Sequence, residues 1–414
     1  MRPAAAEGAP PGNRSSSSPP PADPRVTATS QPAADGPHGR LDDLRALLLR
    51  RGPPELRDAI QSLPGFSQLL GVQGEVLRRV AAALGVRPAR MKHTDGEGVL
   101  ALQSLQPGAA AILLRSYRTP PAAAAAAAAA VAPEPAAPTA AAAPQPAAAP
   151  AAAAAASLPA PPPLHSMAQS VACYSMPDEP VRVVLTTTVS PPDDWPTPQL
   201  DIEVGGTEES LVFYAGMSPR SALSTDLPYL HRYYVQPPHA VQHTPAVQPQ
   251  QQDDGEPHVS SSSGKGGDTG GRSGGGLPSF KQLEAEARKE QGFTPFVSRS
   301  LWVRAIAAGA LCFAVPWQGG QDPQAMEAVR RYTTTLTDIW LAHLLADARI
   351  YAGSGEPALD GGPDASGQRA RWRQASEVLR NYVRHDPVTS LLYPVYGERQ
   401  VLQIIETVAG EEAV

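Results

Sequence analysis

The sequence is poor in cysteine, lysine and aromatic residues, and these shortages exclude several kinds of site. Its 414 residues include two cysteines, Cys173 and Cys312. They lie far apart with no partner spacing, so they can form neither a disulfide framework nor a Cys-x-x-Cys site. This usage predicts a reducing intracellular compartment, the cytoplasm or a virion. Four lysines accompany 30 arginines, an imbalance that a GC-rich coding sequence explains without any function.

Long hydrophobic runs are also missing. The first eleven residues contain no apolar core of the kind that a signal peptide needs. The longest uncharged apolar stretch, residues 305–321, has about 17 residues and is interrupted by Pro316, Gly319 and Gly320. We therefore expect a buried helix there and no membrane association.

Small residues and proline are abundant instead, with 47 prolines and 35 glycines. Three segments contain hardly any large apolar side chains and cannot offset the loss of backbone entropy on folding. We expect a disordered arm at residues 1–39, an Ala/Pro linker at residues 119–166 and a Gln/Gly/Ser linker at residues 241–278.

The segment 40–118 is predicted to be a small basic helical module. Apolar residues recur at helical spacing between Gly and Pro stop signals, which predicts helices at residues 41–51, 54–63, 67–84 and 108–118. Twelve basic and seven acidic residues give this segment a net charge of +5. We predict weak, sequence-independent nucleic-acid binding, with a solvated helix face as an equally weighted alternative. The candidate residues are Arg50, Arg51, Arg78, Arg79, Arg87, Arg90 and Lys92.

A stretch of about 25 residues in this module resembles a known small domain. Residues 77–81, 84–86 and 91–99 are similar to the subunit-binding domain of 2-oxo-acid dehydrogenase acyltransferases, which an Ala/Pro linker also follows. No lipoylation hairpin precedes the stretch and no HxxxDG motif follows it, so the resemblance implies no function here.

The segment 167–240 is acidic and has a β pattern. Val181, Val183, Leu185, Thr187 and Val189 alternate with polar residues, which is typical of a strand with one buried face. The same pattern recurs at residues 200–204 and 211–215. Three such strands predict a small meander that needs a partner surface.

The segment 279–414 is predicted to be an α-helical domain. Ser279 and Gln282 form a capping box, and residues 301–313 are apolar nearly all round, which predicts a central helix. Asp322-Pro323 opens a long helix that extends to residue 351, and further helices are expected at residues 372–383, after Asp386-Pro387 and at residues 401–408. A stripe on the long helix indicates packing within the domain or self-association, and its residues are Val329, Leu336, Trp340, His343 and Ile350.

No assembled catalytic, cofactor-binding or metal-binding set is present in the sequence. His239 and His243 have the spacing of helical zinc ligands but lie in a Pro- and Gln-rich stretch. A formal GxSxG match at residues 271–275 lies in a glycine run, which cannot hold the strained turn of a nucleophile. We expect no cofactor and no metal.

Together these features predict a mainly α fold with a small β island and two helical modules separated by long disordered linkers. The predicted function is a non-enzymatic structural protein, a viral coat or nucleocapsid-like protein that forms homo-oligomers through its C-terminal domain. The alternative is a scaffold or regulatory adaptor, tegument-like or transcription-linked, that binds protein partners.

Overall fold

The computed structural model describes residues 44–120, 162–175, 180–238, 276–297, 309–317, 322–354, 365–385, 387–390 and 392–410. All of these residues belong to one compact unit. The predicted disordered arm and most of both predicted linkers lie outside the described residues.

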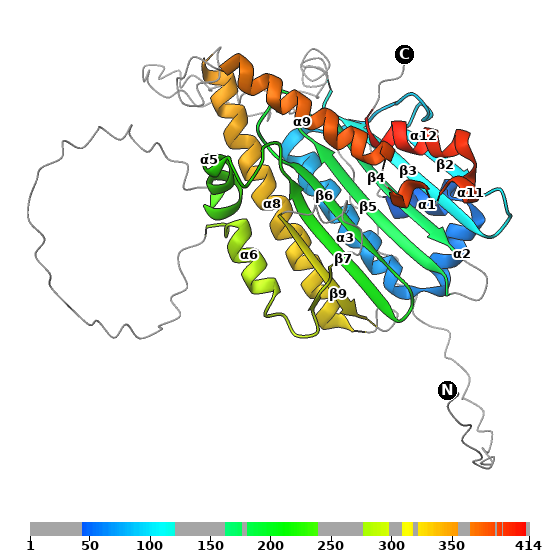
Figure 1. The fold of residues 1–414 in the computed structure, drawn as a ribbon. Helices are drawn as coiled ribbons and strands as arrows, with labels where there is room; N and C mark the ends of the chain where they lie inside the picture. Colours follow the sequence, from blue (N-terminus) through cyan, green and yellow to red (C-terminus); the bar gives the residue numbers. More distant parts are fainter. Residues whose placement is uncertain are drawn as a thin grey trace, which may run out of the picture. The chain divides into compact units, whose positions relative to one another are not determined.

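The centre of the structure is one antiparallel sheet of nine strands (Figure 1). The strands follow the order β1-β3-β4-β5-β6-β7-β9-β8, and β2 also pairs with β3. Their bounds are β1 (Arg87–Pro88), β2 (Val99–Gln103), β3 (Ala110–Arg118), β4 (Ser166–Tyr174), β5 (Arg182–Ser190), β6 (Gln199–Gly206), β7 (Ser210–Ser218), β8 (Thr294–Pro295) and β9 (Ala310–Pro316).

The predicted fold class is therefore wrong. Segments 40–118, 167–240 and 279–414 each contribute strands to this single sheet, so the chain has a mixed α/β fold rather than helical modules and a β island. The β island is the middle of a much larger sheet, and the strands on either side of it supply the partner surface that a short meander needs.

The alternating pattern of the three central strands is confirmed. In the predicted repeats of β5, β6 and β7, at residues 183–189, 200–204 and 211–215, every second side chain is buried on one face. The side chains between them are half-buried or exposed. The antiparallel register keeps buried residues next to one another, with Leu185 opposite Val204 and Val204 opposite Phe213. Since side chains alternate along a strand, a shift of one residue would move this whole set out of the core.

Two predicted helices are strands, which corrects the prediction at residues 108–118 and 301–313. The strand β3 is buried on both faces, and its first five residues are all apolar, a run that periodicity cannot distinguish from a buried helix. In β9, Leu311, Phe313 and Val315 alternate with less buried residues. Residues 301–308 lie outside the described part of the chain.

Helices from both ends of the chain pack on the first face of the sheet. Here α1 (Leu44–Arg51), α2 (Pro54–Ser62), α3 (Pro64–Leu84), α6 (Phe280–Ala287) and α8 (Pro323–Ser354) share one apolar core with the strands. The capping box of Ser279 and Gln282 begins α6, as predicted. The helices α3 and α8 pack against each other behind the strands (Figure 1), although they are far apart in sequence.

The second face carries a smaller helical layer. It consists of α9 (Ala365–His385), α10 (Pro387–Ser390), α11 (Tyr393–Tyr396) and α12 (Glu398–Val408). Val401 and Ile405 of α12 pack on Ile112 of β3, and α9 crosses in front of the central strands (Figure 1). After β7 the chain forms α5 (Leu227–Leu230) and the π-helical turn η1 (His231–Val235).

Candidate ligand-binding groove

The second face of the central strands presents polar groups. Cross-strand pairing places two rows of side chains on this face. One row contains Thr186, Glu203, Tyr214 and Cys312, and the next contains Thr188, Asp201, Gly216 and Ala310. In the second row Asp201 lies between Thr188 and Gly216, and Gly216 has no side chain on that side of the Asp201 carboxyl.

Asp201 is half-buried and held by neutral hydrogen-bond donors. Its Oδ2 accepts from Ser218 Oγ at 2.7 Å, and its Oδ1 accepts from Gln199 Nε2 at 2.9 Å. Burial raises the pKa of Asp201, and the hydrogen bonds from Ser218 and Gln199 oppose that rise. This carboxyl therefore holds a proton more readily than an exposed aspartate does.

Two further groups of this face, Cys312 and Tyr214, also hold their protons more readily than usual. Burial raises the pKa of the Cys312 thiol to about 11, and burial together with the charges of Asp201 and Glu203 raises the pKa of Tyr214. A thiolate is the reactive form of cysteine, so this face supplies hydrogen-bonding groups rather than an activated nucleophile.

A groove with a volume of about 690 Å³ lies at the end of this face, between α9 and residues 219–226. That segment follows Ser218, the hydrogen-bond donor to Asp201, directly in sequence. Pro219 and ten further residues line the groove. The polar ones are Arg220, Ser221, Thr225, Asp226, Arg371 and Gln374, and the apolar ones are Ala222, Ala375, Val378 and Leu379.

Arg220 is the most deeply buried charged residue of the groove, with 2 % of its surface exposed. Its Nη1 donates to the carbonyls of Pro192 and Trp195, the latter at 3.0 Å, and its Nη2 donates to the carbonyl of Pro191 at 2.9 Å. Its Nε has no hydrogen-bond partner in the described structure. Burial lowers the pKa of Arg220 to about 10, so the side chain is still charged at neutral pH.

A buried network around Asp347 anchors η1, which follows the groove segment 219–226 and α5 in sequence. The carboxylate of Asp347, on α8, is fully buried and accepts hydrogen bonds from Tyr233 at 2.9 Å and from Thr197 and Arg232. Burial raises the pKa of Asp347, and Arg232 opposes that rise. The ring of His343 lies 5.1 Å from that of Tyr233, so His343 packs in the core of the chain.

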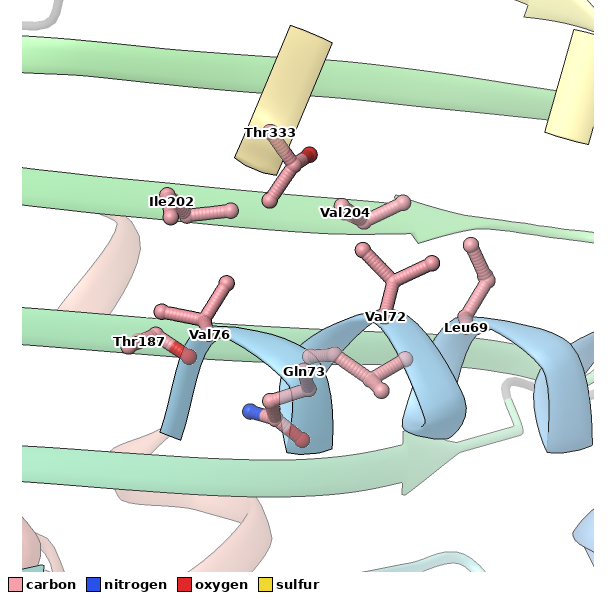
Figure 2. Close-up of a pocket in the computed structure, with 9 residues that line it drawn as sticks. Leu69, Val72, Gln73, Val76, Thr187, Ile202, Val204 and Thr333 are labelled. Carbon is pink, nitrogen blue, oxygen red and sulfur yellow. The ribbon is translucent and has the colours of Figure 1, made fainter. Parts of the chain in front are cut away.

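Figure 2 shows a second, much smaller cavity between α3 and the first face of the sheet. Its volume is about 10 Å³, and its walls include Leu69, Val72 and Val76. Gln73 Oε1 and Thr333 Oγ1, from two of the lining residues, have no hydrogen-bond partner in the described structure. The space is that of roughly one water molecule, which excludes it as a small-molecule site.

The residues predicted to bind nucleic acid do not form one patch of unpaired charge. Arg51 pairs with Asp95 and Glu97, Arg79 with Glu75 and Asp338, and Lys92 with Glu406. The other predicted residues lie on three elements: Arg50 on α1, Arg78 on α3 and Arg87 on β1, with Arg90 just after β1. Nothing in the structure tests nucleic-acid binding, which stays a prediction.

Four residues of the predicted self-association stripe lie inside the chain. Val329, Leu336, Trp340 and His343 are at most 1 % exposed, and Ile350 is half-buried. Trp340 also donates its indole N–H to the carbonyl of Pro198 at 2.8 Å. Packing within one chain accounts for the burial of the stripe, and self-association stays an untested prediction.

No three His, Cys, Asp or Glu side chains of the described residues are grouped closely enough to hold a metal ion. None of the helices in the described ranges combines the length and apolar character that crossing a bilayer requires.

Sequence reasoning did not single out Asp201, Arg220 or Arg371. The alternation of β6 does place Asp201 on the polar face, and this pattern could have indicated Asp201 as a candidate residue. Arg220 and Arg371 lie more than 140 residues apart in the sequence, and nothing in their local patterns links them. Only the packing of α9 beside residues 219–226 brings them to one groove.

Comparisons with known proteins give only a distant likeness to solved structures. The sequence matches no protein-family model and no curated protein. One similar solved structure is that of selenomethionine phytochromobilin synthase from tomato in complex with biliverdin. The likeness covers 82 % of this chain and 83 % of that chain, at 10 % identity and a TM-score of 0.43. We assign no groove residue from it.

The predicted function, a non-enzymatic coat or nucleocapsid-like protein, is wrong, and so is its adaptor alternative. Both were inferred from independent modules and a separate helical domain, whereas the structure has one sheet shared by all three segments.

Proposed function

We propose that the protein binds an amphipathic small molecule in the groove between α9 and residues 219–226. The observation that carries this proposal is the groove itself, which has a volume of about 690 Å³ and a mixed polar and apolar lining. Ligand sites commonly have volumes of about 300–1,000 Å³, with apolar walls and a few polar groups that orient the ligand.

The two walls of the groove come from well-anchored parts of the fold. Arg380 of α9 donates to Asp193 at 2.7 Å, and Ser376 Oγ donates to the backbone carbonyl of the same residue at 3.3 Å. On the other wall, the backbone N–H of Arg220 donates to the hydroxyl of Tyr229 at 2.9 Å. These bonds fix both walls, which lowers the ordering cost of binding.

Fluorescence titration with Nile red, a neutral apolar dye, tests the proposal. Val378 is 59 % exposed and lines the groove, so Val378→Asp changes the lining without burying a charge in the core. We expect it to weaken dye binding about tenfold, the effect of losing about 1.4 kcal/mol.

Leu402→Asp is the matched control, because Leu402 is 42 % exposed on α12 and does not line the groove. It should leave the affinity for Nile red unchanged. Biliverdin is a second probe, since it is an amphipathic pigment whose absorption reports its surroundings. If Val378→Asp and Leu402→Asp changed the affinities for Nile red and biliverdin equally, the two probes would bind outside the groove.

A further inference from the structure

The loop of residues 191–195, between β5 and β6, contacts both walls of the groove. On one wall, the guanidinium of Arg220 donates hydrogen bonds to backbone carbonyls of this loop, those of Pro191, Pro192 and Trp195. On the other wall, α9 is attached to Asp193 of the same loop through Arg380 and Ser376. The spacing of the two walls therefore depends on one short segment of the chain.

His165 lies beside this loop, directly before β4. Its backbone N–H donates to the carbonyl of Ser190 at 3.0 Å, and its Nδ1 lies 3.9 Å from Asp193 Oδ2. The side chain is 26 % exposed, so protons from solvent can reach it. Arg380 donates to the other oxygen of the same carboxylate, Asp193 Oδ1. His165 and the anchor of α9 thus share one carboxylate.

Positive charge acts on His165 from three further elements. In the described part of the chain, these charges are Arg118 at the end of β3, Arg220 after β7 and Arg380 on α9, and Asp193 is the one opposite charge. Burial lowers the pKa of the His165 imidazole below its ordinary value of 6.5, Asp193 opposes this shift, and the three arginines add to it. The imidazole is therefore neutral at neutral pH.

We propose that protonation of His165 loosens the walls of the groove and so weakens ligand binding at acidic pH. This inference rests on the proposed function and adds regulation to that same site. A charged imidazole repels the guanidinium groups of Arg380 and Arg220, which are the groups that attach the two walls to the loop 191–195.

The direction of the effect follows from linkage. A proton binds more readily to a state in which His165 is more exposed and farther from these arginines, so acid favours the looser state. Well above the ordinary value of 6.5 the imidazole is neutral and the walls keep their attachment. The attachment weakens as the pH falls through the lowered pKa of His165.

Nile red titrations of the full-length protein at about pH 7.5 and about pH 5 test the inference. We expect the affinity of the wild type to fall about fivefold at the lower pH, the low end of the usual coupling between two sites. His165→Gln keeps a polar side chain without a charge, so its affinity should match that of the wild type at the higher pH and stay unchanged at the lower pH. His231→Gln is the matched control, because His231 is exposed and does not line the groove, and it should keep the pH dependence of the wild type.

The imidazole NMR signal of His165 gives a readout on the unmodified protein. The midpoint of its titration should lie below 6.5. The midpoint should fall further when Nile red saturates the groove, because the coupling between proton and dye is reciprocal. A midpoint that the dye does not move would overturn the inference.

Two outcomes of the dye titrations would also overturn it. One is an affinity that does not change with pH, and the other is an equal fall of the affinity in the wild type and in His165→Gln. Both outcomes leave the proposed function standing. Failure of Nile red to bind at the higher pH would instead overturn the proposed function itself.

Discussion

Asp347 shows how single buried polar residues hold this fold together. Its carboxylate joins α8 to Arg232 and Tyr233 of η1 and to Thr197 of the β5–β6 loop. These partners lie more than 100 residues away in sequence. Removing a buried carboxylate leaves its partners without the opposite charge and without the hydrogen-bond acceptor that they had.

We expect Asp347→Asn to lower the free energy of unfolding by about 3 kcal/mol, because it removes the negative charge that faces Arg232. Urea denaturation measures the change. The control is Asp338→Asn, on the same helix, whose side chain is 33 % exposed and pairs with Arg79. That substitution should lower the free energy of unfolding by less than about 1 kcal/mol. An equal loss in both variants would contradict a special role for the buried charge of Asp347.

Asp201 predicts a pH dependence of stability with an unusual sign for an aspartate. Burial raises its pKa in the folded state, so the folded protein holds a proton that the unfolded chain releases. This contribution to stability is complete below the ordinary value of 3.8 and is lost as the pH rises through the raised pKa.

Asp201→Asn removes this titration and keeps a polar side chain of similar size. The free energy of unfolding of the variant should therefore fall less than that of the wild type as the pH rises from about 4 to 8. Urea denaturation at several pH values checks this. Parallel pH profiles for the two proteins would show that Asp201 does not titrate as argued.

At the scale of elements, the sequence predicts several helices and the three central strands, but it predicts neither the doubly buried strands nor β9. The predicted helices at 54–63 and 67–84 correspond to α2 and α3, and the long predicted helix corresponds to α8. The strand β4 was not predicted, and its side chains are buried on both faces over most of its length. Alternation is visible only when one face contacts solvent, so such strands carry no period-two signal.

The end of α3 provides a matched pair of glycine substitutions. Gly85 caps α3 with a φ of 65°, in the left-handed region, while Gly71 lies exposed inside the helix with open space around its Cα. Gly85→Ala should therefore destabilise the protein by about 1 kcal/mol. Gly71→Ala should stabilise it by about 0.5–1 kcal/mol, because alanine has the higher helix propensity. Thermal unfolding of both variants checks the opposite signs.

At the scale of the whole molecule, the shared sheet implies that the three segments fold together. The strand β9 pairs with β7 along seven residue pairs, and α8 packs on α3. Residues 279–414 alone would expose the apolar face of α8 and leave β9 paired only with the two-residue strand β8. We expect this fragment to lack a cooperative unfolding transition, measured by circular dichroism, and a cooperative transition would contradict the shared core.

We expect the connection between β3 and β4 to tolerate shortening. The two strands pair directly, and the backbone N–H of Leu164 donates to Thr119 Oγ1 at 3.1 Å, so the chain leaves and re-enters the sheet at neighbouring points. Replacing residues 121–161 with a short Gly/Ser linker should keep the fold and raise the free energy of unfolding by about 1–2 kcal/mol, because a shorter loop loses less entropy on closure. A lower thermal midpoint would show that the segment stabilises the sheet.

The pairing of α3 with α8 also has a consequence for how the protein forms during synthesis. Arg79 and Asp338 are in contact across 259 positions of sequence, so the part of α3 that packs on α8 stays uncovered until α8 has been synthesised. Contacts of such long range slow folding, and the exposed faces invite association with other chains in the meantime. The nascent protein should therefore depend on chaperones until residues near 340 have been translated.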